Sequence, residues 1–333
     1  MTVDELGEHA LLARLLARLP RLSPSVLVGP GDDAAVLEPA RNERLVVTTD
    51  AVVEGVHFSR AHSAPADIGH RALAVNLSDL AAMAATPRWA LLSLVLPGSL
   101  PVADAESLVD GLASLAGRYR VSVAGGNITR TDGPLVVDVT AGGEVSPRRW
   151  LTRGGGRPGD ELYVSGTIGA AAAGLEMLQT GAAGRDAGCI GRHRRPEPRV
   201  RLGVAIGRAR AARAAIDLSD GLAEALRQVA AAGATGIRID ADALPIEPGA
   251  LAWWEARGVD AVRAAVAGGD DYELLFAVSR RQAGALRSVR RHVSEPPLMK
   301  IGELTKDPRE LVLVRNGKTE ALPEGFEHFV ANR

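Results

Sequence analysis

Strand-like and helix-like segments alternate along both halves of the chain, which restricts it to folds that layer helices on a sheet. Short apolar runs bounded by Gly or Pro predict the strands, and apolar residues at helical spacing predict the helices between them. In the first half we expect strands at 45–49, 89–96 and 135–145 and helices at 65–85 and 101–118. In the second half we expect strands at 161–165, 237–240, 273–278 and 311–314 and helices at 168–178, 199–214 and 222–232.

A Gly-, Pro- and Arg-rich stretch, SPRRWLTRGGGRPGD at residues 146–160, separates the two halves. Gly and Pro interrupt regular structure, so this stretch predicts a domain boundary. A length of 333 residues favours two domains. We therefore expect an N-terminal domain over residues 1–147 and a C-terminal domain over residues 148–333, each an α/β (α+β) unit with a mixed sheet packed against helices. We expect residues 180–198 to form a mobile segment.

Short acidic motifs stand in stretches that otherwise carry little charge. They are GPGDDAAV (29–36), TTDAVVEGVHF (48–58), NLSDLAAM (76–83), IDLSDGL (216–222) and GGDDYELL (268–275). Asp79 is the only charged residue between Arg71 and Arg88. A carboxylate in such an apolar run is costly to bury unless a cation meets it. The chain has only three lysines, all near its end, so we interpret the motifs as oxygen ligands for divalent cations that hold phosphates.

Composition excludes several other functions. The net charge of −1 and pI of about 6.7 give no electrostatic case for binding nucleic acid or an anionic membrane. No apolar run reaches the roughly 18 residues of a membrane span, so we expect a cytoplasmic protein. The single cysteine, Cys189, excludes an internal disulfide and a cysteine-cluster metal site. We expect the basic run at residues 192–201 to be a solvated loop that enters a helix.

Each acidic motif also has a plain structural explanation. GPGDDAAV is compatible with an Asx turn before a strand, and Ser219 or an adjacent Asp is compatible with a helix N-cap. A lone His57 is more often structural than functional. AGGNITR, at residues 124–130, predicts a further Gly-pair loop with polar donors. The pairing of two glycines with two aspartates occurs once in each half of the chain, which favours function for both copies.

Familiar nucleotide-binding motifs are absent from the sequence. A G-x-G-x-x-G pattern occurs at Gly154, Gly156 and Gly159, but it contains Pro158 and leads into a predicted strand rather than a helix. The P-loop pattern fails because Val312 stands where its first glycine belongs. A phosphate-handling enzyme of this sequence is therefore neither a P-loop NTPase nor a protein kinase.

Taken in order, the motifs resemble the thiamine-monophosphate kinase family. That family belongs to a wider group with aminoimidazole ribonucleotide (AIR) synthetase, selenophosphate synthetase and a hydrogenase-maturation dehydratase. GDDAA and SDG recur across the wider group, whereas VEGVHF, AVNLSDLAAM, LTRGGGRPGD and IDLSDGL resemble the kinases in particular. The resemblance runs from residue 29 to the C-terminal GFEHF. It implies the two-domain AIR synthetase-like fold and ATP-dependent phosphorylation of thiamine monophosphate.

The resemblance also implies roles for particular residues. The Mg²⁺ ligands would be Asp33, Thr48, Thr49, Asp50, Asp79, Asn127, Asp217 and Asp220. The ATP contacts would be Tyr119, Gly126, Asn127, Arg153 and Ser219. The substrate contacts would be His57, Asp270 and Phe326. The family often has Asp where Asn127 stands and usually Glu where Asp270 stands, and both replacements keep an oxygen donor.

The resemblance further implies several Mg²⁺ ions, ATP as co-substrate, and a homodimer formed through the N-terminal ATP- and metal-binding domain. Two alternatives stay open at this point. One is another ATP-dependent synthetase or dehydratase of the same superfamily. Residues 1–28 contain no cysteine, which argues against selenophosphate-type chemistry. The other is a non-catalytic nucleotide-binding regulator, which the nearly complete set of carboxylates disfavours.

Overall fold

The computed structural model describes residues 1–30, 34–182, 184 and 186–325. The chain divides into two compact units. Unit 1 comprises Met1–Leu80 and Ala85–Pro147, and unit 2 comprises Ala81–Ala84 and Arg148–Arg333. Each unit carries its own sheet and helices, so the mixed α/β class expected from the sequence is confirmed. Residues 81–84 group with unit 2 although they lie inside the first predicted domain.

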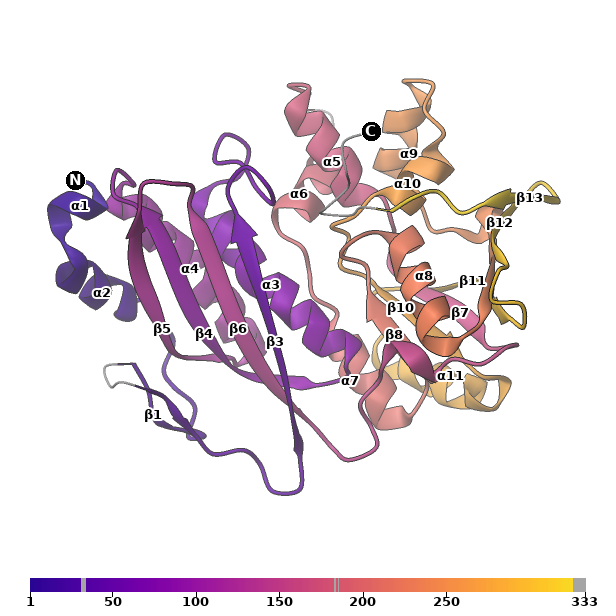
Figure 1. Ribbon diagram of the computed structural model, residues 1–333, viewed down its shortest axis with the longest axis horizontal. Helices are drawn as coiled ribbons and strands as arrows, with labels where there is room; N and C mark the ends of the chain where they lie inside the picture. The colour runs from indigo at the N-terminus through magenta and orange to yellow at the C-terminus, as the bar shows by residue number, and fades with distance from the viewer. Residues whose placement is uncertain (31–33, 183, 185, 326–333) are drawn as a thin grey trace. The chain divides into compact units, whose positions relative to one another are not determined.

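Unit 1 is built on a four-stranded sheet (Figure 1). Its order is β3 (Arg44–Val53), β6 (Val136–Val145), β4 (Thr86–Pro97) and β5 (Ser122–Thr131). β6 is antiparallel to both neighbours, and β4 and β5 are parallel. The expectation of a loop at residues 124–130 was wrong, because this segment lies within β5. Gly126 is needed there for strand packing, since a Cβ at that position would lie 1.9 Å from the Leu92 carbonyl oxygen.

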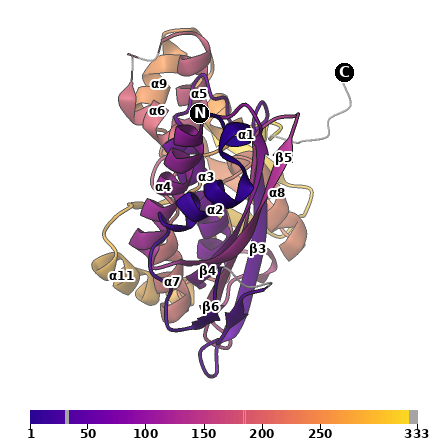
Figure 2. The same cartoon turned by 90° about the vertical axis from the view of Figure 1, so that its left-hand side faces the viewer.

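Helices α3 (Pro65–Ala82) and α4 (Val102–Tyr119) cover one face of this sheet (Figure 2). Pro65 opens α3 and Asp67 lies in its first turn, where the helix dipole favours an acid. The two helices approach closely, because a Cβ on Gly69 would lie 1.8 Å from the Leu108 carbonyl oxygen. The short helices α1 (Val3–Leu6) and α2 (Glu8–Leu16) and the hairpin of β1 (Val26–Val28) and β2 (Val36–Leu37) complete the unit.

Unit 2 contains a seven-stranded sheet in the order β13-β12-β9-β11-β7-β10-β8. The strands are β7 (Glu161–Ser165), β8 (Ala214–Asp217), β9 (Gly236–Asp240), β10 (Leu274–Val278), β11 (Leu298–Thr305), β12 (Leu311–Arg315) and β13 (Lys318–Ala321). β9 and β12 pair in parallel, and the other neighbours pair antiparallel. β10 is buried at every position, which explains why it reads as a continuous apolar run.

The helices of unit 2 lie between these strands in sequence. They are α5 (Ala170–Gln179), α6 (Ala187–Arg194), α7 (Val200–Ala209), α8 (Leu222–Gly233), α9 (Pro248–Glu255), α10 (Ala261–Ala267) and α11 (Ala283–His292). The sequence wrongly extended α7 to residue 214. The helix ends at Ala209, and the capping residue Arg210 has a left-handed φ of 50°. The apolar segment that follows enters the sheet as β8 because it pairs with β10.

The segment expected to be mobile contains α6. Asp186 caps that helix by accepting a hydrogen bond from the Cys189 amide, and Cys189, Ile190 and His193 are buried. Burial of these side chains fixes a segment whose glycines and arginines gave no helical signal. Among the described residues, no helix is long and apolar enough to cross a membrane.

Candidate active site

In unit 1, β3 distributes the Thr-Thr-Asp motif over both faces of the sheet. Thr48 donates a hydrogen bond from Oγ1 to Oδ2 of Asp79 on α3 at 2.5 Å, so it faces the helices. Asp50 is two residues further along the strand and therefore shares that face. Thr49 faces the other way, with its hydroxyl 3.0 Å from the hydroxyl of Thr140. Three predicted metal ligands, Thr48, Asp50 and Asp79, are thus on the helix-covered side.

Asn127 lies on the open face of the same sheet. It is opposite Ser93 on β4, and Ser93 is in turn opposite Asp138 on β6. The Asn127 side chain donates to Oγ1 of Thr129 at 2.9 Å. Asn127 therefore belongs with Thr49 on the open face, and the tertiary structure of unit 1 does not place it beside Asp79.

The other predicted residues of unit 1 lie at the ends of its elements. His57 follows β3, and its Nδ1 accepts a hydrogen bond from the Val53 amide at 3.1 Å. When neutral, the ring therefore carries its proton on Nε2. Tyr119 ends α4 beneath the guanidinium of Arg118, 5.4 Å from its ring centre. Tyr119 precedes β5. Asn127, another predicted ATP contact, lies about 16 Å along that strand from its first residue. Asp33 and Phe326 lie outside the described residues.

In unit 2, the Asp-Leu-Ser-Asp motif lies between β8 and α8. Asp217 ends β8 and is 4% exposed. The N-cap of α8 is Gly221, and no side chain caps this helix. The N-cap explanation for Ser219 or Asp220 was therefore wrong. The backbone N–H groups of the first turn of α8 have no side-chain cap, which is the condition under which a helix N-terminus binds phosphate.

The segment 268–273 packs directly against this motif. The Asp270 amide donates to the Ser219 carbonyl at 2.7 Å, and the Tyr272 amide donates to the Leu218 carbonyl at 2.9 Å. Asp270 accepts a hydrogen bond from the Tyr272 hydroxyl at 3.3 Å. The structure therefore brings Asp217, Ser219, Asp220 and Asp270 together within unit 2. Arg153 is separate, because its short helix, Arg153–Gly155, packs at the C-terminal end of α8, about 18 Å from the N-terminus of that helix.

Sequence reasoning missed the buried acids of the same segment. Asp271 is 2% exposed and accepts hydrogen bonds from the amides of Gly169 and Ala171 at the start of α5. Burial raises the pKa of Asp271 to about 7, against the opposing effect of these amides and of Arg192. Glu273 is 0% exposed and forms ion pairs with Arg192 and Arg199. The acids were visible in GGDDYELL, but only Asp270 had been singled out.

The basic run at residues 192–201 is therefore not simply a solvated loop. Arg192 lies on α6 and Arg199 precedes α7, and both guanidinium groups reach the buried Glu273. Cys189, on the same helix as Arg192, is fully buried, and burial raises the pKa of its thiol to about 12. A thiol that stays protonated at neutral pH is a poor nucleophile.

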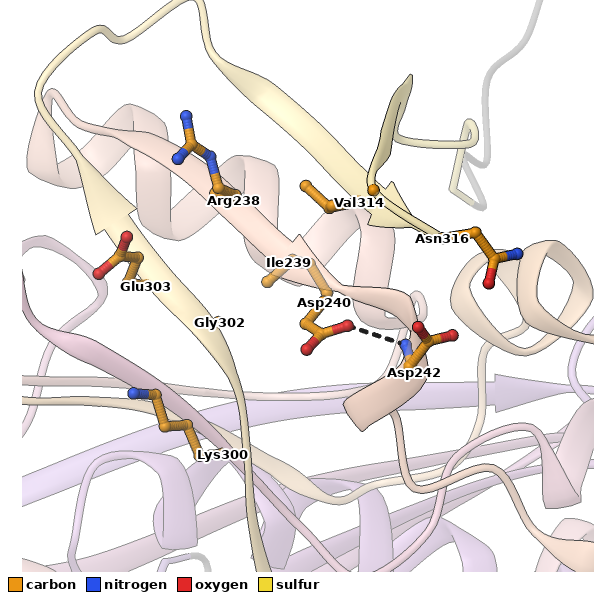
Figure 3. Close-up of a pocket in the computed structure, with 10 residues that line it drawn as sticks. Arg238, Ile239, Asp240, Asp242, Lys300, Gly302, Glu303, Val314 and Asn316 are labelled. Carbon is orange, nitrogen blue, oxygen red and sulfur yellow. Dashed lines mark hydrogen bonds between the residues drawn. The ribbon is translucent and has the colours of Figure 1, made fainter.

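A separate pocket of about 510 Å³ lies over β9, β11 and β12 (Figure 3). Two cations line it, and both form ion pairs, Arg238 with Glu310 at 2.5 Å and Lys300 with Glu161 at 2.7 Å. None of the predicted site residues lines this pocket. Within the part of the chain that the structure describes, no three His, Cys, Asp or Glu side chains are grouped closely enough to hold a metal ion.

Comparison with protein families identifies the architecture. The family model for AIR synthase related protein, N-terminal domain, matches residues 31–145, and the model for the C-terminal domain matches residues 157–315. Together with the two mixed sheets, these matches define a two-domain protein of the AIR synthase related type.

Relatives that match over nearly the full length identify the family within this architecture. Thiamine-monophosphate kinase of Escherichia coli K12 is 41% identical over 328 residues, which cover 97% of this chain and 98% of the relative. The crystal structure of thiamine-monophosphate kinase from Stenotrophomonas maltophilia is 40% identical with a TM-score of 0.77, covering 90% of this chain and 92% of the other. AaThiL complexed with AMPPCP and TMP is 31% identical with a TM-score of 0.76, covering 99% of both chains. The chain belongs to the thiamine-monophosphate kinase family.

Proposed function

We propose that this protein transfers the γ-phosphoryl group of ATP to thiamine monophosphate, giving thiamine diphosphate and ADP. The observation that carries this proposal is the similarity to AaThiL complexed with AMPPCP and TMP over 99% of both chains. We take TMP there as thiamine monophosphate because related chains are named thiamine-monophosphate kinase. Units 1 and 2 are proposed as the N-terminal ATP- and metal-binding domain and the C-terminal domain.

We propose that Mg²⁺ assists the transfer, and the donor chemistry of this chain fits that ion. Thr48, Asp50 and Asp79 present hydroxyl and carboxylate oxygens on one face of unit 1, and Asp217 and Asp220 present carboxylates in unit 2. Hard oxygen donors of this kind suit Mg²⁺. When bound, Mg²⁺ would neutralise charge on the transferring phosphoryl group. Asp33 is proposed as a further ligand from the family resemblance, and Thr49 and Asn127 would hold a separate ion on the open face of the sheet.

The chemical step makes modest demands on the protein. A phosphate monoester has a second pKa of about 6, so the attacking oxygen of thiamine monophosphate is largely ionised at neutral pH without a general base. The chain must then position the two phosphates in line and stabilise their charge. We assign nucleotide binding to Ser219 and the first turn of α8, together with Tyr119, Gly126, Asn127 and Arg153. We assign binding of the thiamine moiety to His57, Asp270 and Phe326.

We further propose a homodimer formed through unit 1. The open face of its sheet exposes Leu45 and Val47 by 55% and 53%, and the β1–β2 hairpin exposes Leu27 by 59%. A cavity of about 820 Å³ lined by leucines of α2 and residues of β4 and β5 adjoins this face. Exposed apolar surface of this extent favours a protein partner, and a second copy is the partner expected of the family. The proposal places the enzyme in the cytoplasm, where ATP is available.

The direct test is product analysis. Purified protein is incubated with ATP, Mg²⁺ and thiamine monophosphate, and the nucleotides and thiamine phosphates are separated by chromatography. We expect equal amounts of ADP and thiamine diphosphate. ADP without thiamine diphosphate would favour a sister synthetase or dehydratase. Binding of ATP without any turnover would favour the regulator, and either result would contradict the proposed kinase activity.

A further inference from the structure

Glu273, which immediately precedes β10, is fully buried and interacts with two arginine side chains. Arg199 donates from Nε to Oε2 at 2.7 Å and from Nη2 to Oε1, while Arg192 donates from Nη2 to Oε1 at 2.8 Å. The Ser165 hydroxyl adds a hydrogen bond to Oε2 at 2.6 Å. A buried carboxylate is tolerated only with such partners, so these groups are fixed relative to one another.

The interactions join four segments of unit 2. Ser165 ends β7, Arg192 lies on α6, Arg199 precedes α7, and Glu273 follows the segment 268–272. Arg192 also donates to the backbone carbonyl of Asp271 at 3.4 Å. We call Arg192, Arg199 and Glu273 the arginine clamp. The clamp therefore holds the C-terminal end of the segment 268–272, which carries Asp270.

That segment adopts a conformation that it would not adopt unaided. Asp270 and Tyr272 have φ angles of 69° and 50°, in the left-handed region that residues with a side chain rarely occupy. Such conformations persist where surrounding contacts impose them. His193, beside Arg192 on α6, faces the Asp270 carboxylate with its Nδ1 3.6 Å from Oδ2. The clamp therefore fixes both the backbone of Asp270 and a side chain that faces its carboxylate.

We propose that the arginine clamp positions Asp270 for binding of the thiamine moiety, so that substrate affinity depends on it more than nucleotide affinity does. The proposal rests on the function proposed above. The neighbouring motif at residues 217–221 is less dependent on the clamp, because β8 and α8 hold it at both ends. Replacing a buried ion pair by apolar residues is often neutral for stability, so stability alone does not require this arrangement.

The two arginines differ in their hydrogen bonds to Glu273 and in their exposure. Arg199 directs two nitrogens at Glu273 and is 14% exposed, whereas Arg192 directs one and is 23% exposed. Nε of Arg192 is buried and has no hydrogen-bond partner within the described part of the chain. We therefore expect Arg199 to matter more than Arg192.

The test uses Arg199→Lys, Arg192→Lys and a matched control, Arg213→Lys. Lysine keeps the charge and loses the planar fork that binds a carboxylate through two nitrogens. Arg213 pairs with the buried Asp160 at 3.0 Å in the same unit, and neither of these residues belongs to the clamp. Steady-state kinetics of the full-length protein give KM for thiamine monophosphate and for ATP, and thermal unfolding gives the loss of stability.

We expect Arg199→Lys to raise KM for thiamine monophosphate roughly tenfold and KM for ATP less than about threefold, because a small displacement of a binding group is costly. Arg192→Lys should follow the same pattern more weakly. Arg213→Lys should lower Tm by a similar amount without changing the ratio of the two KM values. Equal changes in both KM values for Arg199→Lys would overturn the positioning role.

Hydrogen exchange separates failure of this inference from failure of the proposed function. If the clamp holds the segment, the amides of Asp270 and Tyr272 exchange faster in Arg199→Lys than in Arg213→Lys, whatever reaction the wild type catalyses. Unchanged exchange at these two amides would refute the clamp. A wild type that makes no thiamine diphosphate would refute the kinase assignment and with it the substrate-affinity part of the proposal.

Discussion

The two units place their candidate residues on different kinds of structure. In unit 1 the residues lie on long strands, where neighbours in sequence point to opposite faces, so Thr48 and Thr49 are separated by the sheet. In unit 2 they lie on two short connections, where Ser219 and Asp270 are joined by a backbone hydrogen bond of 2.7 Å. Residues adjacent in sequence on a strand can therefore lie on opposite faces of the sheet. Residues far apart in sequence can lie side by side when their loops follow or precede neighbouring strands.

The units also differ in what their acids in apolar surroundings interact with. Asp79 in unit 1 accepts a hydrogen bond from a hydroxyl group, whereas Glu273 in unit 2 is met by two guanidinium groups. A carboxylate already neutralised by arginines is unavailable to a cation. We therefore propose that Asp79 binds a metal ion and that Glu273 has a structural role, and mutation tests each proposal.

The largest expected effect is loss of activity in Asp79→Asn. Removing the charge should lower turnover more than about a hundredfold, because an electrostatic contact to the transferring phosphate would be lost. The melting temperature without Mg²⁺ should stay the same or rise, and the stabilisation by Mg·ATP should shrink. Asp67→Asn, on the same helix, is the control and should keep full activity. Near-wild-type kinase activity in Asp79→Asn would make this carboxylate structural.

Thr48→Val and Thr49→Val test which face of the unit 1 sheet binds the Mg²⁺ ion that limits activity. Thr48→Val removes the hydroxyl that bonds Asp79 and should lower kcat/KM about tenfold at limiting Mg²⁺. Thr49→Val should lower it about twofold or less, because its hydroxyl bonds Thr140 on the open face. Activity titrated against free Mg²⁺ compares the two variants. A larger loss in Thr49→Val would show that the Mg²⁺ ion that limits activity binds on the open face rather than on the helix-covered face.

Asp271→Asn tests the buried acids of unit 2 through pH. The folded-state pKa of Asp271 is raised from 3.8 to about 7, so the folded protein binds a proton that the unfolded chain has released between these values. This group therefore lowers stability progressively as pH rises from about 4 to 7, by roughly 1–4 kcal/mol. The free energy of unfolding of the variant should fall less over this range than that of the wild type, as measured by urea denaturation. Parallel curves would contradict the raised pKa.

A small effect is also expected at Asn127. A neutral amide oxygen lacks the Coulomb attraction of a carboxylate, so Asn127→Asp should lower the Mg²⁺ concentration for half-maximal activity by about two- to fivefold. The reaction should be unchanged. Titration at saturating ATP measures the shift. A shift to higher Mg²⁺ would mean that Asn127 acts as a hydrogen-bond donor to the nucleotide.

Elements with a clear apolar pattern were predictable, and elements that depend on pairing or burial were not. α3 begins at the expected Pro65, and β7 spans the expected residues 161–165. β5 was taken for a loop because its glycines and Asn127 have low strand propensity, yet pairing with β4 imposes the strand. α6 was missed because its stability comes from burying Cys189, Ile190 and His193 rather than from propensity.

The sequence by itself determined the fold class and the family, because both depend on patterns and motifs that are local along the chain. It also nominated Asp79, Ser219 and Asp270, since acids in apolar surroundings and Gly-rich turns are visible without coordinates. Only the tertiary structure decided which face of β3 each threonine occupies and which arginines meet Glu273, 81 and 74 residues away in sequence. Those outcomes depend on strand register and on burial, which arise when distant segments pack together.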